Sequence, residues 1–101
     1  MFSLEKIIKN IAQEVPVAIA EEVAYQPGQI VSKTLAQDTR HSLTLFAFAK
    51  GEEISTHASD GDAMVLMLDG KSKITVAGTP HILEKGETII MPARKPHALF
   101  A

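Results

Sequence analysis

The fold is decided by residues 51–97, which read GEEISTHASDGDAMVLMLDGKSKITVAGTPHILEKGETIIMPARKPH. Short runs of β-favouring residues alternate here with turn residues such as Gly61, Gly78 and Gly86. Strands at a spacing near ten residues, with turn residues between them, are typical of all-β sandwiches and barrels. The segment therefore predicts a small all-β domain.

The same pattern continues on both sides of this segment. The predicted strands are residues 29–35, 42–49, 54–57, 63–68, 72–76, 81–83, 88–91 and 97–100. Asp69-Gly70 predicts a two-residue hairpin turn, because both residues tolerate a positive φ. The run 63–68 is apolar on both faces, so we expect it to be a central strand. No repeat or linker interrupts the chain, and its 101 residues suit one domain.

Only the first 15 residues carry a helical pattern. Apolar residues recur there at spacings of three and four, at Leu4, Ile7, Ile8, Ile11 and Val15. Ser3 is a plausible N-cap, and Pro16 ends the pattern. We expect a short helix that docks on its own domain or on a partner, since its mixed-charge polar face does not favour a membrane surface. We therefore expect the chain to consist of an N-terminal helical or extended segment, residues 1–25, followed by a barrel, residues 26–101.

Composition excludes several functions. With 10 basic and 12 acidic side chains, the net charge of −2 gives no electrostatic footprint for nucleic acid or anionic lipid. The absence of Cys excludes disulfides, thiolate catalysis and Cys-ligated metals. The N-terminal sequence lacks a continuous apolar region like that of a signal peptide, and no apolar run is long enough to span a bilayer, so we expect a cytoplasmic protein.

Two histidines stand at equivalent places in the pattern. Gly51 precedes His57 by six residues, and Gly86 precedes His97 by eleven, with Pro92 between them. In both cases a glycine opens a short β segment that delivers an imidazole at its end or just beyond. If the two segments face each other in a barrel, His57 and His97 lie close together. The other two histidines, His41 and His81, are expected at a turn and on the surface.

The first of these segments resembles a signature motif of the small bacterial cupins, G-x5-H-x-H-x(3,4)-E-x6-G. Gly51, His57 and Gly70 match it, whereas Ser59 stands at the second His position and Ala63 at the Glu position.

The second segment resembles the other cupin motif, G-x5-P-x-G-x2-H-x3-N. Gly86, Pro92 and His97 match, whereas Arg94 replaces the second Gly and Ala101 the Asn. The resemblance covers roughly residues 26–101. It implies a single small cupin β-barrel, a double-stranded jelly roll of the RmlC-like superfamily, and a homodimer paired through N-terminal strands. Related cupins usually continue into one more strand, so we expect an open sheet edge near Phe100.

The resemblance leaves the function open. Cupin metal sites usually use three His and one Glu, and only His57 and His97 remain here as candidate metal ligands. One interpretation is a barrel that binds a small molecule without a metal. The alternatives are a metal-dependent enzyme, of the oxygenase or isomerase type, using Fe, Mn, Ni or Zn, and an assembly module without a ligand. Asp60 or Asp62 could complete a metal site, or both could be turn formers around Gly61.

Several other side chains are candidates for a ligand pocket. Ser59 shares a face with His57 if the strand continues, and Met64 and Phe48 could line the barrel as well as belong to its core. Arg94 and Lys95, next to His97, could hold an anionic ligand at the rim or be solvated.

Overall fold

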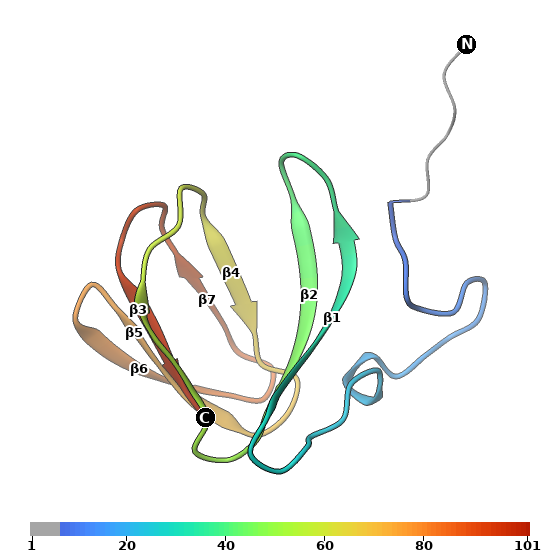
Figure 1. The fold of residues 1–101 in the computed structure, drawn as a ribbon, viewed down its shortest axis with the longest axis horizontal. Coiled ribbons are helices and arrows are strands. Elements are labelled where there is room, and N and C mark those ends of the chain that lie inside the picture. The colour runs from blue at the N-terminus through green and yellow to red at the C-terminus, as the bar shows by residue number, and fades with distance from the viewer. Residues whose placement is uncertain (1–6) are drawn as a thin grey trace.

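The structure, a computed structural model, describes residues 7–101 and is almost entirely β (Figure 1). Its strands are β1 (Ile30–Gln37), β2 (Ser42–Phe48), β3 (Glu53–His57), β4 (Ala63–Leu66), β5 (Lys71–Val76), β6 (Thr79–Glu84), β7 (Thr88–Met91) and β8 (His97–Phe100). Each predicted run corresponds to one of these strands, and the all-β prediction is confirmed. No helix within residues 7–101 is long and apolar enough to cross a membrane.

Consecutive strands pair in the β1-β2 and β5-β6 hairpins, whereas the pairs β3-β8, β8-β5 and β4-β7 join strands that are distant in sequence, as in a jelly roll. One sheet has the order β3-β8-β5-β6, and the pairs β4-β7 and β1-β2 form two smaller antiparallel sheets. The expectation of an open edge near Phe100 is wrong, because β8 lies between β3 and β5. Among the described residues, β2 pairs only with β1, and β4 only with β7.

The hydrophobic core lies between the four-stranded sheet and β4-β7. Ile74 on β5 is 0% exposed, and Leu83 on β6 and Met91 on β7 are buried against it. Ala63 and Val65 on β4 pack on the same cluster. Burying each large aliphatic side chain stabilises the fold by about 1.5–3 kcal/mol, so these few contacts fix one face of each strand.

The predicted hairpin at Asp69-Gly70 is wrong. β4 and β5, which flank these residues, belong to different sheets and do not pair. The hairpin turn lies instead at Ala77 and Gly78, between β5 and β6, where φ is 49° and 83°. Two consecutive positive φ values suit the twist of a two-residue hairpin. Asp69 accepts a hydrogen bond from the Tyr25 hydroxyl at 2.9 Å, which raises the pKa of Tyr25.

The prediction of a central strand at residues 63–68 is also wrong. β4 has one neighbour, β7, within the described part of the chain. Ala63 and Val65 face the core, whereas Met64 between them is 69% exposed. The apolar residues on both faces of this strand therefore do not reflect burial on both sides.

The N-terminal segment is extended, and the predicted helix is wrong for its described part. Ile7 and Ile8 are each 58% exposed, so their apolar side chains find no core. Asn10 and Glu14 both have a φ of 63°, a left-handed conformation that interrupts a right-handed helix. The described segment contains only a 3-10 helix, η1 (Ile19–Glu21). Ser3 and Leu4 lie outside the described residues.

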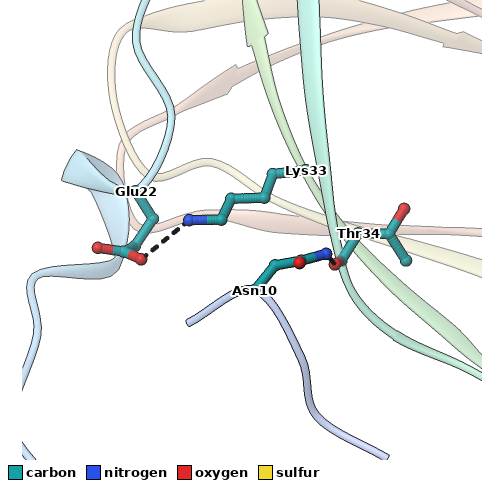
Figure 2. Close-up of polar contacts among 4 residues, drawn as sticks. All are labelled: Asn10, Glu22, Lys33 and Thr34. Carbon is teal, nitrogen blue, oxygen red and sulfur yellow. Dashed lines mark hydrogen bonds and ion pairs between the residues drawn. The ribbon is translucent and has the colours of Figure 1, made fainter. Parts of the chain in front are cut away.

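Polar contacts attach this segment to the free edge of β1 (Figure 2). Ile8 forms a single antiparallel bridge with β1. The Asn10 side-chain amide donates to the Thr34 carbonyl at 2.8 Å, and the Lys33 ammonium lies 3.2 Å from a Glu22 carboxylate oxygen. The segment thus covers part of an edge that would otherwise expose unpaired backbone groups.

Candidate functional site

His57 owes its orientation to an irregularity in β3. Ile54 pairs with Leu99 of β8 and His57 with His97, and the register shifts between these two pairs. His57 is three positions after Ile54, so regular alternation would place their side chains on opposite faces. The shift places one extra residue on β3 and returns His57 to the face of Ile54, as β-bulges commonly do beside functional sites.

His97 reaches the same face through regular alternation. It pairs with Val76 of β5, and Leu99, two residues further on, pairs with the fully buried Ile74. His97 is only 6% exposed, whereas His57 is exposed. One imidazole is therefore fixed against the core and the other borders solvent.

The two imidazoles meet through their Nε2 atoms, which lie 3.0 Å apart. The Nδ1 atom of His57 is 3.1 Å from the Ser55 carbonyl oxygen, and that of His97 is 3.2 Å from the Lys95 carbonyl oxygen. A carbonyl only accepts, so both of these contacts are hydrogen bonds when each Nδ1 carries the ring proton. Each neutral imidazole then has a bare Nε2 lone pair, and the two lone pairs face the same small region.

The ring arrangement supports this reading of the pair. The ring planes of His57 and His97 are inclined by 72°. Their centroids are 4.3 Å apart, compared with 3.0 Å between the two Nε2 atoms. The rings are therefore tilted toward one another instead of pointing head-on. Two bare nitrogens at this distance repel unless a positively polarised atom lies between them. The site is built to receive a hydrogen-bond donor, a proton or a cation.

Two loops, residues 58–62 and 92–96, border the pair, and we call them the rim loops. The Arg94 N–H donates to the Ser59 carbonyl at 2.7 Å, and the Ala93 N–H to an Asp62 carboxylate oxygen at 2.8 Å. These bonds join the loop after β3 to the loop before β8. Sequence reasoning missed this role of Asp62, because it depends on a contact with a residue 31 positions away.

Within residues 7–101, no side-chain hydrogen bond links the other predicted pocket residues to the histidine pair. The Ser59 hydroxyl donates to the Gly61 carbonyl at 2.9 Å, and Met64 lies on the exposed face of β4. Phe48 is half-buried on β2, 5.7 Å from Phe46 between ring centroids.

The remaining two histidines are exposed, as expected. His41 lies in the β1–β2 turn and His81 on β6.

A surface groove on the four-stranded sheet lies away from the histidine pair. It has a volume of about 260 Å³, and its lining includes Glu53, Lys73, Thr75 and Phe100. These side chains alternate with those that face the core, so the groove is on the outer face of the sheet. It is open and shallow, and it contains no convergent set of acceptors like that of the histidine pair. We therefore take the pair as the candidate site.

The residues fit a metal ion only in part. A separation of 3.0 Å suits two imidazole nitrogens on one transition metal ion, since such bonds are about 2.0–2.1 Å long. The backbone acceptors at both Nδ1 atoms are also typical of metal-binding histidines. Within residues 7–101, however, no group of three or more His, Asp or Glu side chains is placed to hold a metal. The described residues therefore do not supply a complete metal centre.

Comparison with known proteins gives the family. The sequence profile of the Cupin domain family matches residues 44–101. A conserved protein of unknown function from Streptococcus pyogenes is 38% identical, with 98% of this chain and 87% of that chain covered and a TM-score of 0.93. A cupin superfamily protein from Desulfitobacterium hafniense is 35% identical, with 91% and 84% covered and a TM-score of 0.87.

A third solved structure is similar over part of its length. The Cupin 2 conserved barrel domain protein from Leptotrichia buccalis is 46% identical, with 81% of this chain but 39% of that chain covered and a TM-score of 0.79. No curated protein sequence matches the chain significantly. The family profile, the jelly-roll topology and the similar structures together show that the chain belongs to the cupin family.

Proposed function

We propose that this protein binds a small molecule at the His57–His97 pair. One observation carries the proposal, the approach of the two Nε2 atoms to 3.0 Å while both Nδ1 atoms are bonded to carbonyls. Such a pair presents two acceptors to one donor group of a ligand, for example a hydroxyl or an amine. The hydrogen bonds between the rim loops support the site, because they join the loop after His57 to the loop before His97.

Binding of this kind has a direct test with a matched control. We expect His57→Ala and His97→Ala each to abolish the thermal stabilisation given by hits from a small-molecule library. A ligand at 100 times its dissociation constant should raise the free energy of unfolding by about 2.7 kcal/mol. His81→Ala is the control, because His81 is exposed on β6. Hits that survive in the His57 and His97 variants would contradict the proposal.

A metal-dependent enzyme is the second candidate, favoured by the convergence of the two Nε2 atoms. Two protein ligands leave most of a coordination shell to be filled from elsewhere. We expect no stoichiometric metal after reconstitution with Fe, Mn, Ni and Zn. Near-stoichiometric metal that is lost in His57→Ala or His97→Ala would favour the metal-dependent function instead.

We further propose that the protein is a homodimer. The N-terminal segment supports this, because Ile7, Ile8 and Val15 expose large apolar side chains on an extended backbone. A second copy could cover them. Light scattering should give twice the chain mass, and a monomer at all concentrations would contradict the proposal. An assembly module without a ligand would show the dimer but no hits in the library screen.

A further inference from the structure

Arg94 has a backbone conformation that is unfavourable for arginine. Its φ is 67°, in the left-handed region where a side chain with a Cβ atom is strained and glycine is not. The Arg94 N–H donates to the Ser59 carbonyl at 2.7 Å, and this bond holds the conformation. Strained residues of this kind cluster at functional sites, where the surrounding structure supports them.

The place of Arg94 in the fold links it to the histidine pair. It lies three residues before His97, and the carbonyl oxygen of the neighbouring Lys95 is 3.2 Å from His97 Nδ1. Its bonding partner Ser59 follows His57 by two residues. Arg94 therefore stands where the two rim loops meet, at the end of the barrel where both imidazoles are found.

The side chain of Arg94 is available to a ligand. Arg94 and Lys95 are exposed, and neither belongs to the ion pairs within residues 7–101. Asp60 and Asp62 are the nearby acidic residues in sequence on the facing rim loop, and Asp62 already gives one carboxylate oxygen to the Ala93 N–H. No ion pair within residues 7–101 therefore occupies the Arg94 guanidinium, which leaves it able to bind an anion from solution.

We propose that Arg94 selects small carboxylic acids that also carry an O–H or N–H donor. The guanidinium presents parallel donors that match both oxygens of a carboxylate, and the two Nε2 acceptors receive the donor group of the same molecule. The inference rests on the proposed function, because it adds a charged anchor to the ligand site at His57 and His97. Arg94 then determines specificity, while the histidines hold the uncharged part of the ligand.

The replacement Arg94→Gly separates the side chain from the backbone. Glycine removes the guanidinium and relieves the strained φ, so the variant should fold at least as stably as the parent. Titrations would use lactate and glycolate, each compared with its uncharged amide, followed by chemical shifts of the backbone amides. We expect the parent to bind the acids more tightly than the amides, and Arg94→Gly to lose about tenfold or more of that preference.

Two further variants sharpen the test. Lys95→Ala removes the neighbouring cation and should change the preference for acids less than Arg94→Gly does. Asp60→Asn removes a negative charge from the facing rim loop and should strengthen binding of the acids, whereas it would weaken binding of a cation. Weaker binding of the acids by Asp60→Asn would overturn the inference.

The remaining outcomes distinguish the inference from the proposed function. Equal binding of acids and amides, or binding of neither acid at millimolar concentration, would show that Arg94 does not select carboxylates. Binding of the acids that is unchanged in His97→Ala would instead contradict the ligand site at the histidine pair. Loss of acid binding in both Arg94→Gly and His97→Ala, with folding retained, is the result that we expect.

Discussion

The described N-terminal segment, residues 7–29, and the part of the chain after Gly51 are both rich in apolar residues, but only the second buries them. Ile74, Leu83 and Met91 form a core with side chains from β4 and β7, whereas Ile7 and Ile8 remain exposed. Strands after Gly51 pair with other strands in sheets, whereas the N-terminal segment forms one bridge with β1 and a few polar contacts, such as that from Tyr25 to Asp69.

The difference shows that an apolar pattern forms a helix or a strand only where another surface packs against its apolar side chains. A helix shorter than about 12–15 residues is marginal alone and depends on packing of its apolar face. The N-terminal pattern has the correct spacing but no surface that covers it, so the backbone forms isolated contacts with β1 instead. The strands after Gly51 have both the pattern and neighbours to pack against.

The largest expected effect is on the core of the second region. Ile74→Ala removes a fully buried side chain and should lower the free energy of unfolding by about 2–5 kcal/mol. At concentrations where the protein is monomeric, Ile8→Ala in the N-terminal segment should change it by no more than about 0.5 kcal/mol, because Ile8 is 58% exposed within one chain. Urea denaturation of both variants measures the contrast. Similar losses for the two variants would show that the segment is packed in solution, as a dimer interface would require.

The next effect concerns the hydrogen bonds between the rim loops. Asp62→Ala removes the acceptor of the Ala93 N–H and should cost about 1 kcal/mol in urea denaturation. Asp62→Asn keeps a side-chain oxygen at the same place and should lose less. Equal losses would mean that the negative charge of Asp62, and not its accepting oxygen, supports the rim loops.

A smaller and local effect is expected where the N-terminal segment is attached. Asn10→Ala removes the bond to the Thr34 carbonyl and places a less tolerant residue at a φ of 63° (Figure 2). Hydrogen exchange of the Lys9 amide, which donates to the Leu35 carbonyl at 2.7 Å, should accelerate. Amides of β5 should exchange as before, and acceleration there would show that the two regions unfold together.

The smallest effect is a pH dependence at the β1–β2 turn. One Asp38 carboxylate oxygen accepts from the N–H groups of Arg40 at 2.7 Å and His41 at 2.6 Å, which lowers the pKa of Asp38 below its usual 3.8. A lowered pKa contributes stability that is present above 3.8 and is lost as the pH falls through the folded-state value. Asp38→Ala should therefore differ from the parent at neutral pH and converge with it in acid. A constant difference across this range would contradict the assignment.

Much of the fold could be predicted from the order of turn residues and β-favouring runs. Eight strands occur where alternating runs were found, and the spacing of Gly51 from His57 and of Gly86 from His97 correctly suggested that the two imidazoles meet. The assignment of strands to sheets could not be predicted, because Asp69-Gly70 and Ala77-Gly78 are both acceptable turns locally. Which of them closes a hairpin depends on long-range pairing.

The details of the site also depend on contacts distant in sequence. The register shift in β3 reverses the side-chain alternation before His57. No residue type between Ile54 and His57 predicts such a shift. The Nδ1 acceptors are backbone carbonyls of Ser55 and Lys95, which any residue type could supply. The sequence therefore predicted that the two imidazoles meet, but not the protonation and orientation in which they are held.

That state can be measured directly by long-range proton–nitrogen correlation spectra of the histidine side chains in alkaline solution. The structure predicts that His57 and His97 both carry their proton on Nδ1, with Nε2 bare, because each Nδ1 faces a carbonyl. Added ligand should shift the Nε2 resonances of both residues and leave those of His81 unchanged. A neutral His57 or His97 with its proton on Nε2, or a ligand that shifts neither resonance, would contradict the paired-acceptor site.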